Sequence, residues 1–174
     1  MSDATQAQNT YSGEALYTFV LGLADSKSVV DKILADAGID KIDPEAWYDF
    51  TWAEDFFVEA QRVLGPAVLN QCGKTMIESA TYPPEINSIE TLLPAIGHWY
   101  ALHARGPGVG TVACELQDAH SATAAWSTGR FPCSFCRGIL EGACTRYGVR
   151  PLIEHGTSGC RDDGAKTCIY HVSW

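Results

Sequence analysis

Apolar residues recur at helical spacing along residues 12–105. In the first segment the spacing is i, i+3, i+4 and i+7, which is typical of a helix with one buried face. The residues with this spacing are Leu16, Phe19, Val20 and Leu23. Taken along the chain, the pattern predicts helices within 12–25, 28–38, 42–50, 51–65, 66–80 and 87–105.

Capping signals support several of these helix starts. Asp43 precedes Pro44, a combination that favours the first turn of a helix and here predicts a short one. Capping-box spacing is present twice, in Thr51 with Glu54 and in Asn87 with Glu90. We therefore predict that two of the longer helices begin at these positions.

The pattern changes after the glycine-rich segment 106–110. Residues 110–129 alternate around a central QDAH turn and predict a β-hairpin, while 149–155 and 167–174 predict two more strands. Between them lies a predicted helix with Gly138 and Gly142 four residues apart. This spacing lets a neighbouring backbone approach closely; the alternative is that the helix merely tolerates the two glycines. The fold class is therefore α+β, with N-terminal helices packed on a small antiparallel sheet and one C-terminal helix inserted. We expect residues 1–12 to be a flexible polar tail and 13–174 a single domain.

The composition fits one ordered domain, because 46% of the 174 residues are hydrophobic and 19% are charged. A net charge of −9 disfavours binding to nucleic acid or to an anionic membrane surface. No apolar run reaches the 18 residues that predict a membrane span. The polar start lacks the order of a signal peptide, so we expect a cytoplasmic protein.

The chain has seven cysteines, an odd number. In a reducing compartment, free thiols or metal ligands are expected rather than disulfides. Cys72 and Cys114 stand alone among apolar neighbours and are predicted to be buried small side chains. The other five lie near the C-terminus, so any chemistry of the thiols is expected there.

A metal site is one interpretation of this C-terminal group. Structural zinc takes four Cys or His ligands. His155, Cys160 and Cys168 surround one polar turn, and Cys133, at a predicted helix start, is a candidate for the fourth position. Spacing alone leaves two alternatives open: unrelated thiols on a surface turn, or a redox couple in which Cys133 is paired with Cys136 in a CxxC motif.

Residues 133–174 resemble the C-terminal half of the 4-vinyl reductase-type domains, also called hydrocarbon-binding domains. The resemblance is carried by a cysteine before a Gly-x-x-x-Gly helix, then C-x3-G-x3-C and an aromatic strand; these are Cys133, Gly138, Gly142, Cys160, Gly164, Cys168 and Tyr170. The family is related in fold to haem/nitric-oxide-binding sensor domains and to TRAPP-type trafficking subunits.

The resemblance implies a closed zinc site of structural function. Zinc-binding relatives add a glutamate three residues before the final cysteine pair, but this chain has Thr157 there. His155 is therefore our first choice for the fourth ligand, followed by Glu154 and then Cys136. Iron in place of zinc stays open.

The resemblance further implies an apolar cavity between the helices and the sheet, and hence a stand-alone sensor or carrier for a hydrophobic small molecule. Aromatic residues crowd the helical part, and such walls are usual for ligand pockets. The candidate pocket residues are Trp47, Trp52, Phe56, His98, Trp99 and Tyr100. A homodimer and a separate signalling protein are the implied partners.

Other classes of function stay open as alternatives. No G-x-S-x-G, G-x-G-x-x-G or P-loop motif marks an enzyme, so catalysis on a hydrophobic or tetrapyrrole-like substrate is not expected. A haem-based or thiol-redox sensor is a second alternative. Haem itself is not expected, because the Tyr-x-Ser-x-Arg cradle of the nitric-oxide-sensing relatives is missing, although His98, His103 and His120 offer imidazoles.

Overall fold

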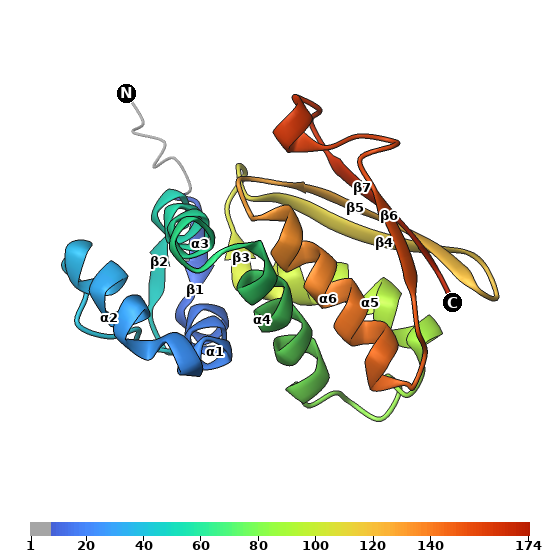
Figure 1. Cartoon of the computed structure of the whole chain (residues 1–174), viewed down its shortest axis with the longest axis horizontal. Helices are drawn as coiled ribbons and strands as arrows, with labels where there is room; N and C mark the ends of the chain where they lie inside the picture. The colour runs from blue at the N-terminus through green and yellow to red at the C-terminus, as the bar shows by residue number, and fades with distance from the viewer. Residues whose placement is uncertain (1–7) are drawn as a thin grey trace, which may run out of the picture.

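The computed structural model describes residues 8–174. Helices α1, α2 and α3 gather at one end of the molecule and a four-stranded sheet lies at the other, as Figure 1 shows. In chain order the elements are β1 (Thr10–Ser12), α1 (Gly13–Gly22), η1 (Ala24–Ser26), α2 (Lys27–Asp36), β2 (Trp47–Asp49), α3 (Phe50–Leu64), α4 (Pro66–Ser79), α5 (Ile89–His103), β3 (Ala104–Arg105), β4 (Gly110–Asp118), β5 (Ser121–Thr128), α6 (Cys133–Arg146), β6 (Leu152–His155), η2 (Arg161–Asp163) and β7 (Cys168–Ser173). The fold is α+β, which confirms the predicted class.

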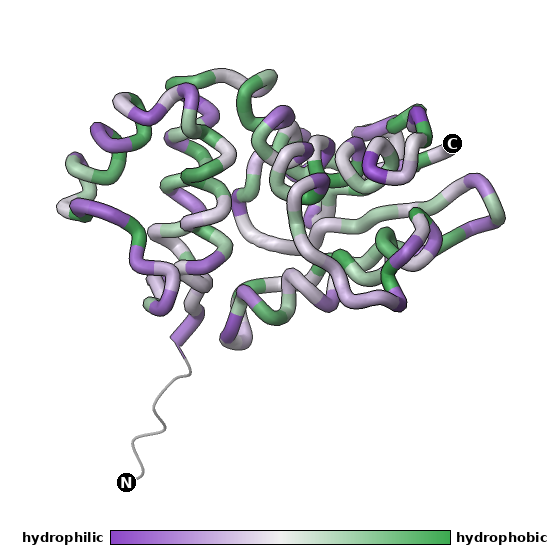
Figure 2. The backbone as a smooth tube through the Cα atoms, turned by 90° about the horizontal axis from the view of Figure 1, so that it is seen from below, coloured by the Kyte–Doolittle hydropathy of each residue, from purple (hydrophilic) through white to green (hydrophobic). Residues whose placement is uncertain are grey.

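Two antiparallel sheets organise the chain. The short strands form a sheet of order β2-β1-β3, and the predicted hairpin and C-terminal strands form a sheet of order β4-β5-β7-β6. Along β5 alternate residues are buried, so one face of the larger sheet is covered. Helices α4, α5 and α6 lie on that side (Figure 1). Figure 2 shows the complementary pattern, with hydrophobic stripes along the helices and a hydrophilic tip on the β4–β5 hairpin.

Three local predictions are corrected in the first lobe, our name for β1, β2 and helices α1, α2 and α3. Residues 47–49 form strand β2, which pairs with β1, where a short helix was expected. Helix α3 begins after Asp49, whose carboxylate accepts a hydrogen bond from the Trp52 N–H at 3.0 Å, so Thr51 is not the cap. Glu54 instead points inward and accepts a hydrogen bond from the Arg130 N–H.

The remaining differences are smaller. Helix α5 has its capping box at Ser88 and Thr91, one residue later than predicted. Residues 10–12, expected in the polar tail, form β1 with Tyr11 and Ser12 buried, while the first seven residues of that tail lie outside the described part of the chain. Within residues 8–174, no helix combines the length and the apolar character needed to cross a membrane.

Candidate functional site

Four side chains from α6, β6, β7 and the segment before η2 converge in one place. Cys133 opens α6, His155 ends β6, Cys168 opens β7, and Cys160 lies just before η2. One potential ligand atom from each lies within 4.8 Å of all the others. The Sγ atoms of Cys133 and Cys168 are 3.5 Å apart, and those of Cys133 and Cys160 are 3.8 Å apart. We call these four residues the thiol cluster.

His155 has the features of a ligand to this cluster. Its Nε2 atom is buried and has no hydrogen-bond partner within residues 8–174, a situation that is costly unless a partner or a metal satisfies the nitrogen. Its ring stacks on Tyr170, with centroids 4.2 Å apart, which fixes its orientation. The alternative donors lie elsewhere: Glu154 is exposed on β6, and Cys136, though buried, is not part of the cluster.

Arg161 supplies positive charge to the cluster. Its backbone N–H and its Nε–H both donate to Cys168 Sγ, at 3.3 and 3.1 Å. Burial by itself would raise the pKa of the Cys168 thiol, but these two donors, the Cys133 thiol and the Arg161 charge together lower it. The pKa of Cys133 is raised, first by burial and then by the neighbouring Cys168. The cluster thus favours the thiolate form of Cys168. A bound metal ion would also favour the thiolate forms of Cys133 and Cys160.

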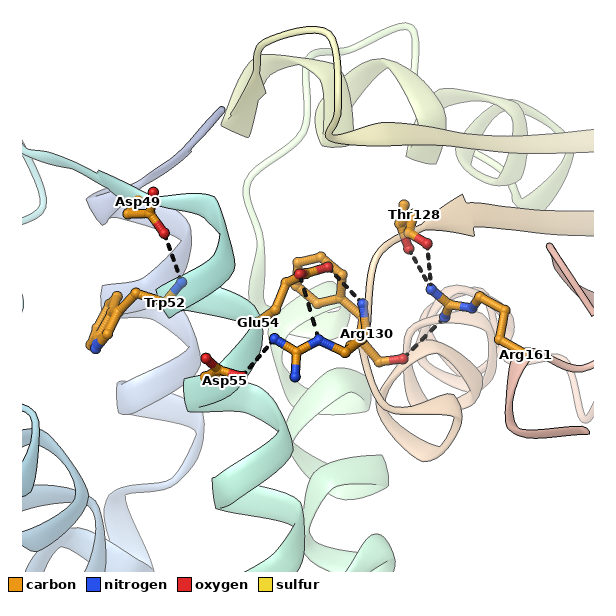
Figure 3. A network of polar contacts seen from close by, with 8 residues as sticks. Asp49, Trp52, Glu54, Asp55, Thr128, Arg130 and Arg161 are labelled. Carbon is orange, nitrogen blue, oxygen red and sulfur yellow. Dashed lines mark hydrogen bonds and ion pairs between the residues drawn. The ribbon is translucent and has the colours of Figure 1, made fainter. Parts of the chain in front are cut away.

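The same guanidinium also bonds to the end of β5 and to the turn that follows it, as Figure 3 shows. Arg161 Nη1 donates to the Thr128 carbonyl oxygen at 2.7 Å and to its hydroxyl at 3.1 Å, while Nη2 donates to the Phe131 carbonyl oxygen at 3.0 Å. Outer-shell contacts of this kind orient ligands. Arg161 therefore joins the thiol cluster to residues 128–131.

The first lobe holds this segment from the other side. The buried carboxylate of Glu54 on α3 accepts a hydrogen bond from the Arg130 N–H at 2.6 Å, and Asp55 pairs with the Arg130 guanidinium at 2.6 Å (Figure 3). Gly129 leaves the space for Glu54, because a Cβ there would collide with the carboxylate. Burial raises the pKa of Glu54. Residues 128–131 are thus clamped between α3 and Arg161.

Replacing Arg161 by methionine tests this clamp. We expect the free energy of unfolding to fall by about 2 kcal/mol, because the carbonyl groups of Thr128 and Phe131 lose charged donors in a half-buried setting. Urea unfolding measures the change. The control is Arg137→Met, since Arg137 is exposed and forms an i, i+4 ion pair with Glu141. Equal destabilisation by the two variants would contradict the clamp.

A cavity of about 570 Å³ lies between the first lobe and the sheet. Helix α1 closes one side, the end of α4 and the chain after it close another, and α5, α6, β4 and β5 supply the rest. The lining residues are Tyr11, Glu14, Ala15, Thr18, Met76, Ile77, Ser79, Ala80, Thr81, Tyr82, Ile96, Trp99, Tyr100, His103, Val112, Trp126, Phe135 and Ile139. The walls are mostly apolar with a few polar groups, the usual form of a small-molecule site.

His103 is the one imidazole in this wall. Its Nδ1 atom is 2.7 Å from the Ser12 hydroxyl, which also caps α1 by accepting the Ala15 N–H. Burial lowers the pKa of His103, so the neutral ring is favoured at neutral pH. No hydrogen bond within residues 8–174 involves its Nε2 atom. The ring is therefore oriented through Nδ1 and keeps its other nitrogen available.

Only part of the predicted pocket lines this cavity. Trp99 and Tyr100 do, whereas Trp52 and Phe56 border a second space of about 290 Å³ between α2 and α3. Trp47 lies beneath the Arg105 guanidinium at 3.6 Å, and His98 is exposed; neither borders these two spaces. Sequence reasoning placed neither Tyr11 nor His103 in the pocket, since their partners lie far away along the chain.

Comparison with known proteins identifies the fold. No family model matches the chain, and no curated protein sequence does. Solved structures do match: an oxygen-binding H-NOX domain related to soluble guanylate cyclases is 16% identical, covers 92% of each chain and has a TM-score of 0.69. An H-NOX protein from S. oneidensis in the Fe(II) ligation state is 17% identical, with 93% and 95% coverage and a TM-score of 0.68.

A likeness at this identity establishes the fold alone. It agrees with the expected relation to haem/nitric-oxide-binding sensors, while membership of the 4-vinyl reductase family finds no support in these comparisons. It also corrects one expectation. Haem was not expected, yet the matched structures are H-NOX domains, and one with 14% identity and a TM-score of 0.68 was solved to probe haem distortion in that family. Haem therefore has to be considered for this fold.

The residues that line the cavity can be compared with the groups that haem binding requires. A protein-bound haem iron needs an axial ligand, and histidine is a common one. His103 meets this need, being a half-buried imidazole that is oriented by Ser12 and lines an apolar cavity. Within residues 8–174, no lysine or arginine lines the cavity; Arg146 stacks on the ring of the wall residue Tyr82 at 4.4 Å and stands outside the lining. The residues present thus fit haem at its iron, through His103.

Proposed function

We propose that this chain is a small-molecule sensor domain whose ligand occupies the cavity between the first lobe and the sheet, and that haem held through His103 is the ligand to test first. The observation that carries the proposal is the imidazole of His103, fixed by Ser12 and facing an apolar space. Bound haem would supply an iron centre that takes up diatomic gases. The chain itself would hold the iron through His103 and exclude water with its aromatic walls.

The hydrogen bond between Ser12 and His103 suggests how ligand binding in the cavity would change the surface of the protein. Ser12 joins His103 to the first turn of α1. A ligand that displaced His103 would therefore change the cap of α1, and an allosteric ligand must make such a differential contact. We propose that the signal then passes to a separate protein. A homodimer and a cytoplasmic location stay predictions.

Replacing His103 by alanine tests the haem proposal. We expect wild-type protein to bind added ferric haem with a shifted Soret absorption band, and His103→Ala to weaken that binding at least about tenfold, because the axial ligand is lost. His98→Ala is the matched control: it removes an exposed imidazole from the same helix. Spectroscopic titration measures both affinities.

Two results separate the possible outcomes. Equal haem affinity in the two variants would rule out His103 as the axial ligand. If the wild type bound no haem but bound an aromatic hydrocarbon, the cavity would belong to a carrier or sensor of hydrophobic molecules instead. That second function is favoured by the apolar walls around Trp99 and Trp126.

We also propose that the thiol cluster binds one metal ion through Cys133, His155, Cys160 and Cys168. The unpartnered Nε2 of His155 supports this ligand set over Glu154 or Cys136. Four protein ligands would close the coordination shell, which suits a structural rather than a catalytic ion. The bound metal ion would link α6 to β6 and β7. Elemental analysis of the purified chain identifies the metal.

A further inference from the structure

Tyrosine hydroxyls in the cavity wall differ in their hydrogen bonding. Three tyrosines line the cavity. The Tyr82 hydroxyl donates to the Ile77 carbonyl oxygen at 2.6 Å, and the Tyr100 hydroxyl donates to the Val109 carbonyl oxygen. Among residues 8–174, the Tyr11 hydroxyl has no such partner. It is also not among the side-chain atoms sealed from solvent without a partner, so it keeps access to the cavity.

Tyr11 is held firmly in place. Its side chain is only 8% exposed, and its backbone lies in the central strand of the β2-β1-β3 sheet. Its ring packs against those of Phe50, Phe57 and Phe131, with centroids 6.1, 6.1 and 5.5 Å away. Such edge contacts fix an aromatic ring. The hydroxyl therefore cannot readily turn away to find another partner.

Of the other hydroxyls in the wall, those of Thr18 and Ser79 are bonded to the chain, and Thr81 lies exposed in the segment after α4. The Thr18 hydroxyl donates to the Glu14 carbonyl oxygen at 2.9 Å, and the Ser79 hydroxyl donates to the Thr75 carbonyl oxygen at 2.7 Å. Burial raises the pKa of Tyr11, so its phenol stays protonated at neutral pH and can donate. A ligand without an acceptor would displace water from this phenol and leave it unpaired in an apolar wall, whereas a ligand with an acceptor would replace the lost hydrogen bond.

We propose that Tyr11 determines ligand specificity by donating a hydrogen bond to an acceptor oxygen, of the carbonyl or carboxyl type, on an otherwise apolar ligand. The inference rests on the proposed function, since it requires the cavity to be the ligand site. It goes further by naming the chemical group that the ligand carries. A pure hydrocarbon would leave the Tyr11 hydroxyl unpaired and would bind less well than an oxygen-bearing molecule of the same shape.

Fluorenone and fluorene test this directly, because the two share a tricyclic shape and differ by a carbonyl group. Trp99 and Trp126 line the cavity, so quenching of tryptophan fluorescence reports binding of either compound. We expect Tyr11→Phe to reduce the preference for fluorenone over fluorene by about fivefold, the worth of one hydrogen bond. Tyr82→Phe is the control, since it removes a hydroxyl already bonded to the chain.

The outcomes separate this inference from the proposed function. If both compounds bind and Tyr11→Phe leaves their affinity ratio at the wild-type value, the role of Tyr11 is overturned and the cavity stands. A change in Tyr82→Phe as large as that in Tyr11→Phe also overturns it. If neither compound binds the wild type while haem does, the role of Tyr11 is overturned and the proposed haem site stands; if haem does not bind either, the proposed function fails as well.

Discussion

Replacing Cys168 by serine will abolish the metal binding that we propose for the thiol cluster and lower the free energy of unfolding by about 4 kcal/mol or more. The effect is large because metal binding to a closed site contributes directly to folding. Cys168 is fully buried at the start of β7 and accepts both Arg161 donors. Serine would leave the Arg161 charge facing a neutral hydroxyl and would break the link between α6 and the C-terminal strands.

Metal content per chain and urea unfolding in reducing buffer, each with and without a chelator, measure this effect. The control is Cys72→Ser, because Cys72 is equally buried, donates to the Phe19 carbonyl oxygen and lies outside the cluster. That variant should retain the metal. A chelator should destabilise the wild type and Cys72→Ser but leave Cys168→Ser unchanged. Full metal occupancy in Cys168→Ser, or none in the wild type, would refute the site.

Local periodicity predicted the helical part of this fold well. Leu16 and Phe19 are fully buried, as the spacing of the first helix requires. The prediction failed at residues 47–49, where a three-residue strand forms only because β1 pairs with it. It failed again at Glu54, which has capping-box spacing but bonds to Arg130, far along the chain. Both failures reflect tertiary contacts that override local signals.

The two candidate sites also differ in how well local sequence signals locate them. His155 and Cys168 could be grouped from the sequence because their strands pair next to each other around one turn. The cavity could not be located so well. His103 is defined by its contact with Ser12, which is 91 residues away, and Tyr11 lay in a segment expected to be a tail. Composition reveals many aromatic residues but not which of them face a cavity.

Replacing Gly138 by alanine will lower the free energy of unfolding by about 3 kcal/mol. Helices α4 and α6 form an extensive contact, and a Cβ on Gly138 would collide with the backbone of Asn70, including its Cα at 3.0 Å. Backbone cannot rotate away as a side chain does, so the helices must separate and lose buried packing. Alanine also favours a helix over glycine by about 1 kcal/mol, and that gain opposes the loss.

The measured stability shows which of two effects is larger, the clash with the Asn70 backbone or the higher helix propensity of alanine. Arg137→Ala is the control, because Arg137 is the exposed neighbour of Gly138 on α6, and its loss should change stability by about 0.5 kcal/mol at most. Urea unfolding of both variants measures the difference. Stability at or above wild type in Gly138→Ala would mean that helix propensity outweighs the clash. The close approach of α4 and α6 would then not depend on this glycine, contrary to what the spacing of Gly138 and Gly142 predicts.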